Sequence, residues 1–195
     1  MPPRWRGFVA IATLLFSWPV TAEYALGDSG APVKIVEYAS FSCRYCVQFH
    51  RAVFPLLKAR HIDTGRVQFI YRHYPTSSAA LRGAVAAHCA GSAWYYEMLD
   101  VLYLSVARWQ QAPNIDEALV QEAASLGLDE AQFAACLNEP QRAERIRVGQ
   151  RRAQATHGVR GTPTFIINGQ VVRGLLRVDE LNALIERALL ATNGS

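Results

Sequence analysis

The sequence lacks several features that mark common classes of protein. It has no internal repeat and no low-complexity tract. Its apolar runs are too short for a protein that crosses a membrane several times. Only 18% of its 195 residues are charged while 51% are hydrophobic, which excludes a disordered polymer. A chain of this length can fill one core, or form one domain that carries a substantial insertion.

The first residues have the pattern of a secretory signal peptide over positions 1–22. Arg4 and Arg6 form a positive start, residues 7–16 are apolar, and Val20-Thr21-Ala22 fits a small-residue cleavage site. An uncleaved N-terminal anchor is the alternative. Removal of the two arginines would lower the net charge from +4 to +2, which is too little for a nucleic-acid-binding surface.

Hydrophobic patterning next predicts two strands joined by a helix. Residues 32–39 and 67–72 are rich in β-branched and aromatic residues, and the stretch 43–60 has helical periodicity with an expected kink at Pro55. A strand, a helix and a strand in this order form a βαβ unit with parallel strands.

The end of the chain returns to a sheet pattern. Residues 164–167 and 170–173 predict two strands, and the Asn168-Gly169 pair between them is a strong hairpin signal. An amphipathic helix is expected over residues 178–190. The chain should therefore close with a β-hairpin and a helix.

The middle of the chain, residues 77–157, is Ala-rich and predicts a bundle of three to five helices. We therefore expect the α/β fold class, with one domain formed by residues 23–76 and 158–195. The helical segment would be an insertion that interrupts this domain.

Cys43 and Cys46 form a C-x-x-C motif where the first strand passes into the first helix. Free backbone N–H groups and the positive end of the helix dipole stabilise a thiolate there, and Arg44 adds a nearby cation. Cys46 lies about one turn deeper and can attack a mixed disulfide at Cys43. The pattern predicts an exposed nucleophile at Cys43 and a more buried resolving thiol at Cys46.

Metal and haem sites fit this cysteine pattern poorly. A closed zinc site needs a second pair of ligands, whereas Cys89 and Cys136 stand far apart. A c-type haem motif needs His after the second cysteine, and position 47 is Val. No metal is predicted, although a chaperone that binds Cu(I) through Cys43 and Cys46 stays open as an alternative.

Cys89 and Cys136 lie on apolar faces of predicted helices. Two inert buried thiols are one interpretation, because free cysteine is commonly buried. Export to an oxidising compartment favours the other, a structural disulfide between them.

Two motifs and the helical block between them resemble the DsbA family of bacterial disulfide oxidoreductases. The motifs are Phe41–Cys46, which holds the C-x-x-C, and Gly161–Phe165, and the resemblance covers about residues 26–190. It implies a thioredoxin fold with a helical insertion. It also implies an enzyme, without a cofactor, that introduces or exchanges disulfides in secreted proteins through a Cys43–Cys46 redox pair.

The resemblance also assigns further site residues. Pro163 should be a cis-proline that faces the cysteine pair, and the backbone of Thr162 should bind an extended substrate segment. Glu37 should be a buried acid that accepts a proton from Cys46 or tunes its pKa. Arg72 on the neighbouring strand is the expected counter-ion of Glu37.

The motif departs from the family in one respect. DsbA oxidases typically carry Pro-His between the cysteines, and here Arg44 and Tyr45 shape the site. At positions 45 and 162, the Tyr and Thr resemble the residues of the isomerase and reductase relatives DsbC and DsbG. Those relatives carry an N-terminal dimerisation domain, for which the expected mature chain leaves no room. For His50, one turn beyond Cys46, two interpretations stay open: a residue that flanks the site or, more commonly, a partly exposed structural residue of the helix.

These observations favour a monomeric periplasmic oxidase that a DsbB-like membrane partner reoxidises. Its substrates would be exported proteins that contain cysteine, and nucleic acid is not an expected partner. Two further alternatives are a reductase or isomerase kept reduced by a membrane donor, and a glutathione-transferase relative that would not need Cys46.

Overall fold

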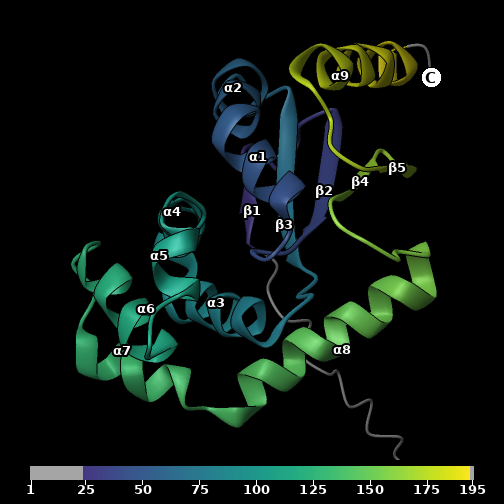
Figure 1. Ribbon diagram of the computed structural model, residues 1–195. Coiled ribbons are helices and arrows are strands. Elements are labelled where there is room, and N and C mark those ends of the chain that lie inside the picture. The colour runs from purple at the N-terminus through teal and green to yellow at the C-terminus, as the bar shows by residue number, and fades with distance from the viewer. Residues whose placement is uncertain (1–23, 194–195) are drawn as a thin grey trace, which may run out of the picture.

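The computed structural model describes residues 24–193, which form one mixed sheet with helices around it (Figure 1). The predicted signal peptide lies outside the described residues. The sheet order is β1-β3-β2-β4-β5, in which β2 and β3 are parallel and the other pairs are antiparallel. The strands are β1 (Ala25–Leu26), β2 (Val33–Ala39), β3 (Val67–His73), β4 (Thr164–Ile167) and β5 (Gln170–Arg173).

The helices fall into three groups along the chain. The first group follows β2 and comprises α1 (Arg44–Ala52), α2 (Phe54–Leu57) and the π-helix η1 (Lys58–Ile62). The second group lies between β3 and β4 and comprises α3 (Ser78–Cys89), α4 (Gly91–Leu104), α5 (Val106–Gln110), α6 (Ile115–Ala124), α7 (Glu130–Leu137) and α8 (Pro140–His157). The chain closes with α9 (Val178–Asn193). Figure 1 shows α3 to α7 gathered beside the sheet, while the long α8 runs back towards β4 and β5.

The thioredoxin fold with many added helices is confirmed, and the strand and hairpin predictions hold closely. Asn168 and Gly169 both have positive φ, 44° and 87°, as a type I′ hairpin turn requires. The helical segment, however, holds six helices rather than three to five. Gly91, with φ 74°, separates α3 from α4, and Ser105 separates α4 from α5 without a proline to mark the break.

The helix predicted over 43–60 is divided in three. The first break falls at Val53, the residue that caps both α1 and α2. Pro55 explains the break, because it has no N–H to bond the carbonyl four residues earlier and its ring crowds that carbonyl. The expected kink is therefore a change of helix, and the residues of α1 can pack independently of α2.

The two faces of the sheet pack against different partners. Side chains alternate along a strand, so Val33, Ile35 and Glu37 of β2 share one face. The two apolar residues belong to the main core, together with residues of α1 and α9. On the opposite face, Tyr38 of β2 belongs to a smaller cluster with Ala153 of α8. Alternation thus places the carboxylate of Glu37 on the main-core face.

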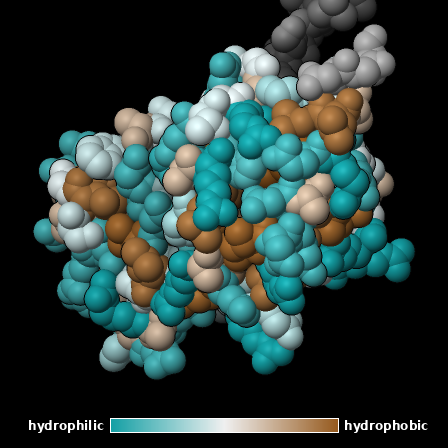
Figure 2. Space-filling view, turned by 90° about the horizontal axis from the view of Figure 1, so that it is seen from above, coloured by the Kyte–Doolittle hydropathy of each residue, from teal (hydrophilic) through white to brown (hydrophobic). Residues whose placement is uncertain are grey.

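The surface mixes polar and apolar side chains. The view from above shows several separate hydrophobic areas among hydrophilic residues (Figure 2). Within residues 24–193, every helix is too short or too polar to cross a membrane.

The cysteines of the helical segment form a disulfide, which confirms that prediction. Cys89 at the end of α3 is bonded to Cys136 in α7, 47 residues away. Both residues are partly buried, and Cys89 packs against the edge of the core. In the unfolded chain, the bond keeps these two segments close together. The unfolded chain then has less conformational freedom, which favours the folded state.

Replacement of Cys89 and Cys136 by serine should lower the free energy of unfolding by about 4 kcal/mol, because the closed loop of 47 residues restricts the unfolded chain. Urea denaturation measures the change. Both proteins compared should also carry Cys43→Ser and Cys46→Ser, so that the active-site thiols contribute nothing. Equal free energies would show that the disulfide does not stabilise this fold.

Candidate active site

The C-x-x-C motif lies at the first turn of α1, and a sulfur caps this helix. Cys43 is the N-cap residue, and its Sγ accepts a hydrogen bond from the backbone N–H of Cys46 at 3.3 Å. Cys43 is half-buried, whereas Cys46 is fully buried on the inner face of the helix. Both are free thiols, so this geometry is that of the reduced protein. Cys46 is buried as expected from the sequence, whereas Cys43, which was expected to be exposed, keeps only part of its surface open.

A loop from the far end of the chain lies against Cys43. The Thr162–Pro163 peptide bond is cis, and the carbonyl oxygen of Thr162 lies 3.3 Å from Cys43 Sγ, whose thiol form donates to it. Pro163 is buried, and Thr162 keeps part of its surface exposed. The fold thus brings together the two motifs that carry the family resemblance.

The surroundings drive the two sulfurs to opposite protonation states. Hydrogen bonds lower the pKa of Cys43 from its ordinary value of 9.0 to about 5, although partial burial opposes them. The Cys46 side chain makes the largest contribution, and Thr162 and the N–H groups of Cys46 and Tyr45 add to it. Burial, the bond to Cys43 and the charge of Glu37 together raise the pKa of Cys46 far above its ordinary value. At neutral pH the pair holds one thiolate and one thiol.

Arg44 and Tyr45 form a surface pair between the cysteines. The Arg44 guanidinium lies 4.5 Å from the centre of the Tyr45 ring and donates to its hydroxyl at 2.5 Å. Both side chains are exposed. The largest causes of the lowered pKa of Cys43 are hydrogen bonds, so the predicted role of the Arg44 charge is minor.

Glu37 is buried beneath the cysteines as predicted, but its partner is a different residue. Its Oε2 lies 2.8 Å from Nε2 of His50, and both side chains are almost fully buried. The expected counter-ion, Arg72, instead donates to the hydroxyl of Tyr38, which points to the opposite face of the sheet. His50 was expected to be partly exposed. Its spacing, four residues after Cys46, was the available signal, because residues i and i+4 share one helix face.

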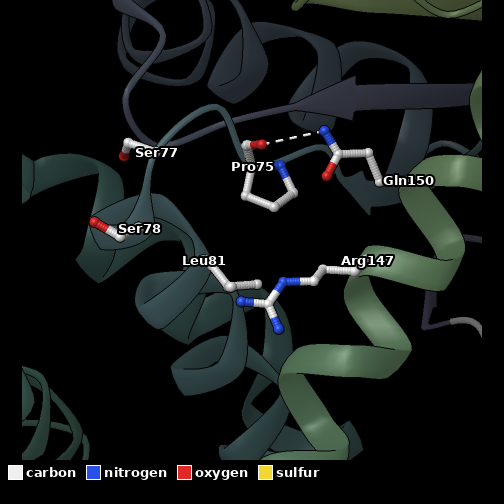
Figure 3. Close-up of a pocket in the computed structure, with 6 residues that line it drawn as sticks. All are labelled: Pro75, Ser77, Ser78, Leu81, Arg147 and Gln150. Atoms are coloured by element: carbon white, nitrogen blue, oxygen red, sulfur yellow. Dashed lines mark hydrogen bonds between the residues drawn. The ribbon is translucent and has the colours of Figure 1, made fainter.

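A cavity adjoins the loop that precedes Cys43. It has a volume of about 310 Å³ and lies between α3 and α8 (Figure 3). Ser77 on its wall is hydrogen-bonded to Ser42, and Arg147 and Leu81 face it from the two helices. Gln150 donates to the carbonyl of Pro75 at 3.2 Å across its rim.

Within residues 24–193, no three His, Cys, Asp or Glu side chains are grouped so as to hold a metal ion. A Cu(I) site formed by the two sulfurs of Cys43 and Cys46 would not need such a group.

Comparison with known proteins assigns the family. Residues 20–187 match the protein family described as Thioredoxin. The crystal structure of alpha-DsbA1 from Wolbachia pipientis has a TM-score of 0.81 and 28% sequence identity, and the match covers 89% of this chain and 94% of that one. The chain belongs to the DsbA-like branch of the thioredoxin family.

Two further matches support the fold and show what share of its relatives' length the DsbA-like chain covers. The structure of BdbD from Bacillus subtilis has a TM-score of 0.77 at 21% identity, covers 86% of this chain and 93% of that one, and supports the fold. A protein of Rickettsia conorii, provisionally named a protein-disulfide oxidoreductase, is 25% identical over 168 residues. That match covers 86% of this DsbA-like chain but 60% of the relative, so the chain spans about three fifths of the curated relatives' length.

Cys46→Ala should raise the pKa of Cys43 from about 5 towards 9, because the variant removes the largest contribution that lowers it. The backbone N–H of residue 46 remains, so the pKa should stay below that of a free cysteine. The ultraviolet absorbance of the thiolate, followed against pH, measures this. Cys43→Ser provides the control, since it should abolish the transition. A pKa for Cys43 that does not change in Cys46→Ala would contradict this account.

Proposed function

We propose that this DsbA-like protein is an exported thiol:disulfide oxidoreductase that acts on cysteine-containing secreted proteins through Cys43 and Cys46. The observation that carries the proposal is the opposite shift of the two sulfur pKa values at the start of α1. A pair of titrating groups whose environments separate their pKa values is typical of a catalytic site.

The exchange proceeds in two displacements. A substrate thiolate attacks Cys43 Sγ of the oxidised pair, and Cys46 leaves with the electron pair of the broken S–S bond and takes up one proton. The second thiolate of the substrate then attacks its own sulfur in the mixed disulfide and releases Cys43 as a thiolate. Two electrons reach the protein, the substrate gains a disulfide, and the exposed position of Cys43 makes it the attacked atom.

We favour oxidation as the direction in the cell. A couple becomes a stronger oxidant as its reduced form is stabilised, and the Cys43 thiolate stabilises the reduced form of this protein. The rival direction, reduction or isomerisation, is suggested by Arg44 and Tyr45 in place of the Pro-His of oxidases. A redox titration distinguishes the two.

The remaining site residues receive roles by the same reasoning. Glu37 would exchange a proton with the buried Cys46, whose pKa its charge raises. The partly exposed backbone of Thr162 would bind an extended substrate strand beside Cys43. A DsbB-like membrane protein would restore the disulfide, in agreement with the signal-peptide pattern of residues 1–22 and with a periplasmic location. We further propose that residues 77–157 form an insertion in the thioredoxin-like domain.

Equilibration with reduced and oxidised glutathione should show that the Cys43–Cys46 couple is more oxidising than that of thioredoxin. Cys43→Ser should abolish oxidation of a reduced test protein, whereas Cys46→Ser should accumulate a mixed disulfide at Cys43 because the resolving thiol is missing. The Cys89→Ser/Cys136→Ser variant should remain active and serves as the control. A thioredoxin-like potential would favour the reductive alternative, and an active Cys43→Ser would overturn the mechanism.

The stability of the reduced protein should rise with pH relative to Cys43→Ser. The pKa of Cys43 is about 5 when folded and near 9.0 when unfolded, so the unfolded thiol binds the extra proton between these values. The thiolate's contribution is complete above pH 9 and is lost as the pH falls to 5. Thermal unfolding of the two reduced proteins across this range measures the difference. A constant difference in Tm would show that Cys43 is not a thiolate in the folded protein.

A further inference from the structure

The buried Glu37–His50 pair has two unsatisfied atoms. Nε2 of His50 bonds Oε2 of Glu37, while Oε1 of Glu37 and Nδ1 of His50 are buried without a hydrogen-bond partner. Burial of a polar pair is costly even when the pair is internally bonded, and each unsatisfied atom adds to the cost. An arrangement of this kind in the core calls for a functional explanation.

His50, which bonds Glu37, also lines a cavity. The cavity has a volume of about 260 Å³, and His50, Asp100 and Tyr103 are on its wall. Exposed residues at its rim, Leu104 and Asp63, show that it opens to solvent. The two nitrogens of an imidazole flank one ring carbon and point in different directions. Nε2 faces Glu37, so Nδ1 is the nitrogen of His50 that is left to exchange a proton elsewhere.

We infer that His50 is a relay residue that carries the proton of Cys46 between Glu37 and the solvent in this cavity. The inference rests on the proposed thiol:disulfide exchange and adds the route by which the buried sulfur reaches water. Cys46 is 0% exposed and Glu37 is 0% exposed, so neither can exchange a proton with solvent directly. An imidazole can accept at one nitrogen while it donates from the other.

The proton balance is one per turnover in each direction. When the disulfide is reduced, a proton enters at Nδ1 of His50, Nε2–H passes one to Glu37, and the carboxyl protonates the Cys46 sulfur as it leaves. When a disulfide oxidant such as oxidised glutathione forms a mixed disulfide with Cys43, the Cys46 thiol gives its proton to Glu37. Its thiolate then attacks the Cys43 sulfur, the bond to glutathione breaks, and glutathione leaves as a thiolate with that electron pair. The proton on Glu37 leaves through His50.

The two tyrosines beside His50 are poor candidates to carry the proton, which leaves His50 as the residue between Glu37 and the cavity. Burial raises the pKa of Tyr71 and of Tyr103 well above the usual value, so both phenols stay neutral and bonded to each other at 2.7 Å. The ring of His50 stacks on that of Tyr103 with centres 4.0 Å apart. The charged groups around it are Glu37 on β2, Asp100 on α4, Lys58 on η1, Asp63 directly after η1 and Arg51 on its own helix.

Two variants test the relay. His50→Phe keeps a ring to stack on Tyr103 but removes both nitrogens, and His50→Gln keeps a donor for Glu37 that cannot pass a proton on. Both should slow closure of the mixed disulfide at Cys43 by about tenfold or more, as loss of acid–base catalysis does. Rapid-mixing kinetics with oxidised glutathione, measured from pH 5 to 9, should also show a changed pH profile. If His50→Phe does not fold, His50→Gln decides.

His61→Phe is the matched control for the loss of a buried histidine. His61 is equally buried, but its Nε2 bonds Oδ1 of Asn182 at 2.9 Å, far along the chain from the cysteines. This variant should close the mixed disulfide at the wild-type rate. A structural role for His50 predicts a normal rate and pH profile in His50→Gln, and that result would overturn the relay. If instead the wild-type protein fails to oxidise a reduced test protein, the proposed function itself is wrong.

Discussion

The hydrogen bond from the Cys46 amide to the Cys43 sulfur is the contact on which the site depends. Helix starts leave N–H groups without partners, and here a sulfur serves as the cap. A thiolate accepts such a bond better than a neutral sulfur, so the charge stabilises the helix and the helix stabilises the charge. Because the charge exists only in the reduced form, local helix structure and redox state are coupled.

The sheet brings the Thr162–Pro163 loop next to the start of α1. β2 ends shortly before Cys43, and its neighbour β4 begins directly after that loop. The contact between Cys43 and Thr162 joins residues 119 positions apart. It depends on the antiparallel pairing of β2 with β4, which aligns the two ends at the same edge. Electrostatic tuning and the surface for a substrate strand therefore come from the same pairing.

The buried Glu37–His50 pair beneath the cysteines lowers the stability of the core. Glu37 belongs to the face of β2 that packs on the core, where an apolar residue would give greater stability. His50 partly compensates the buried carboxylate, and Tyr103 covers its ring. The core thus gives up stability next to Cys46 to hold groups that can carry a proton, a departure from local consistency that is expected at functional sites.

The sequence by itself determined four of the five strands, the hairpin, a distortion of the helix at Pro55 and the position of Cys43 at a helix start, because these follow from periodicity and local backbone chemistry. The short strand β1 was not predicted. The resemblance added the facing proline loop and the buried Glu37. Only the tertiary structure decided that His50, rather than Arg72, pairs with Glu37. The reason is geometric: adjacent residues of a strand face opposite sides of the sheet, and the side on which Arg72 lies depends on strand pairing. The number of helices between β3 and β4 was also decided there, since no proline or glycine in the sequence marks the break at Ser105.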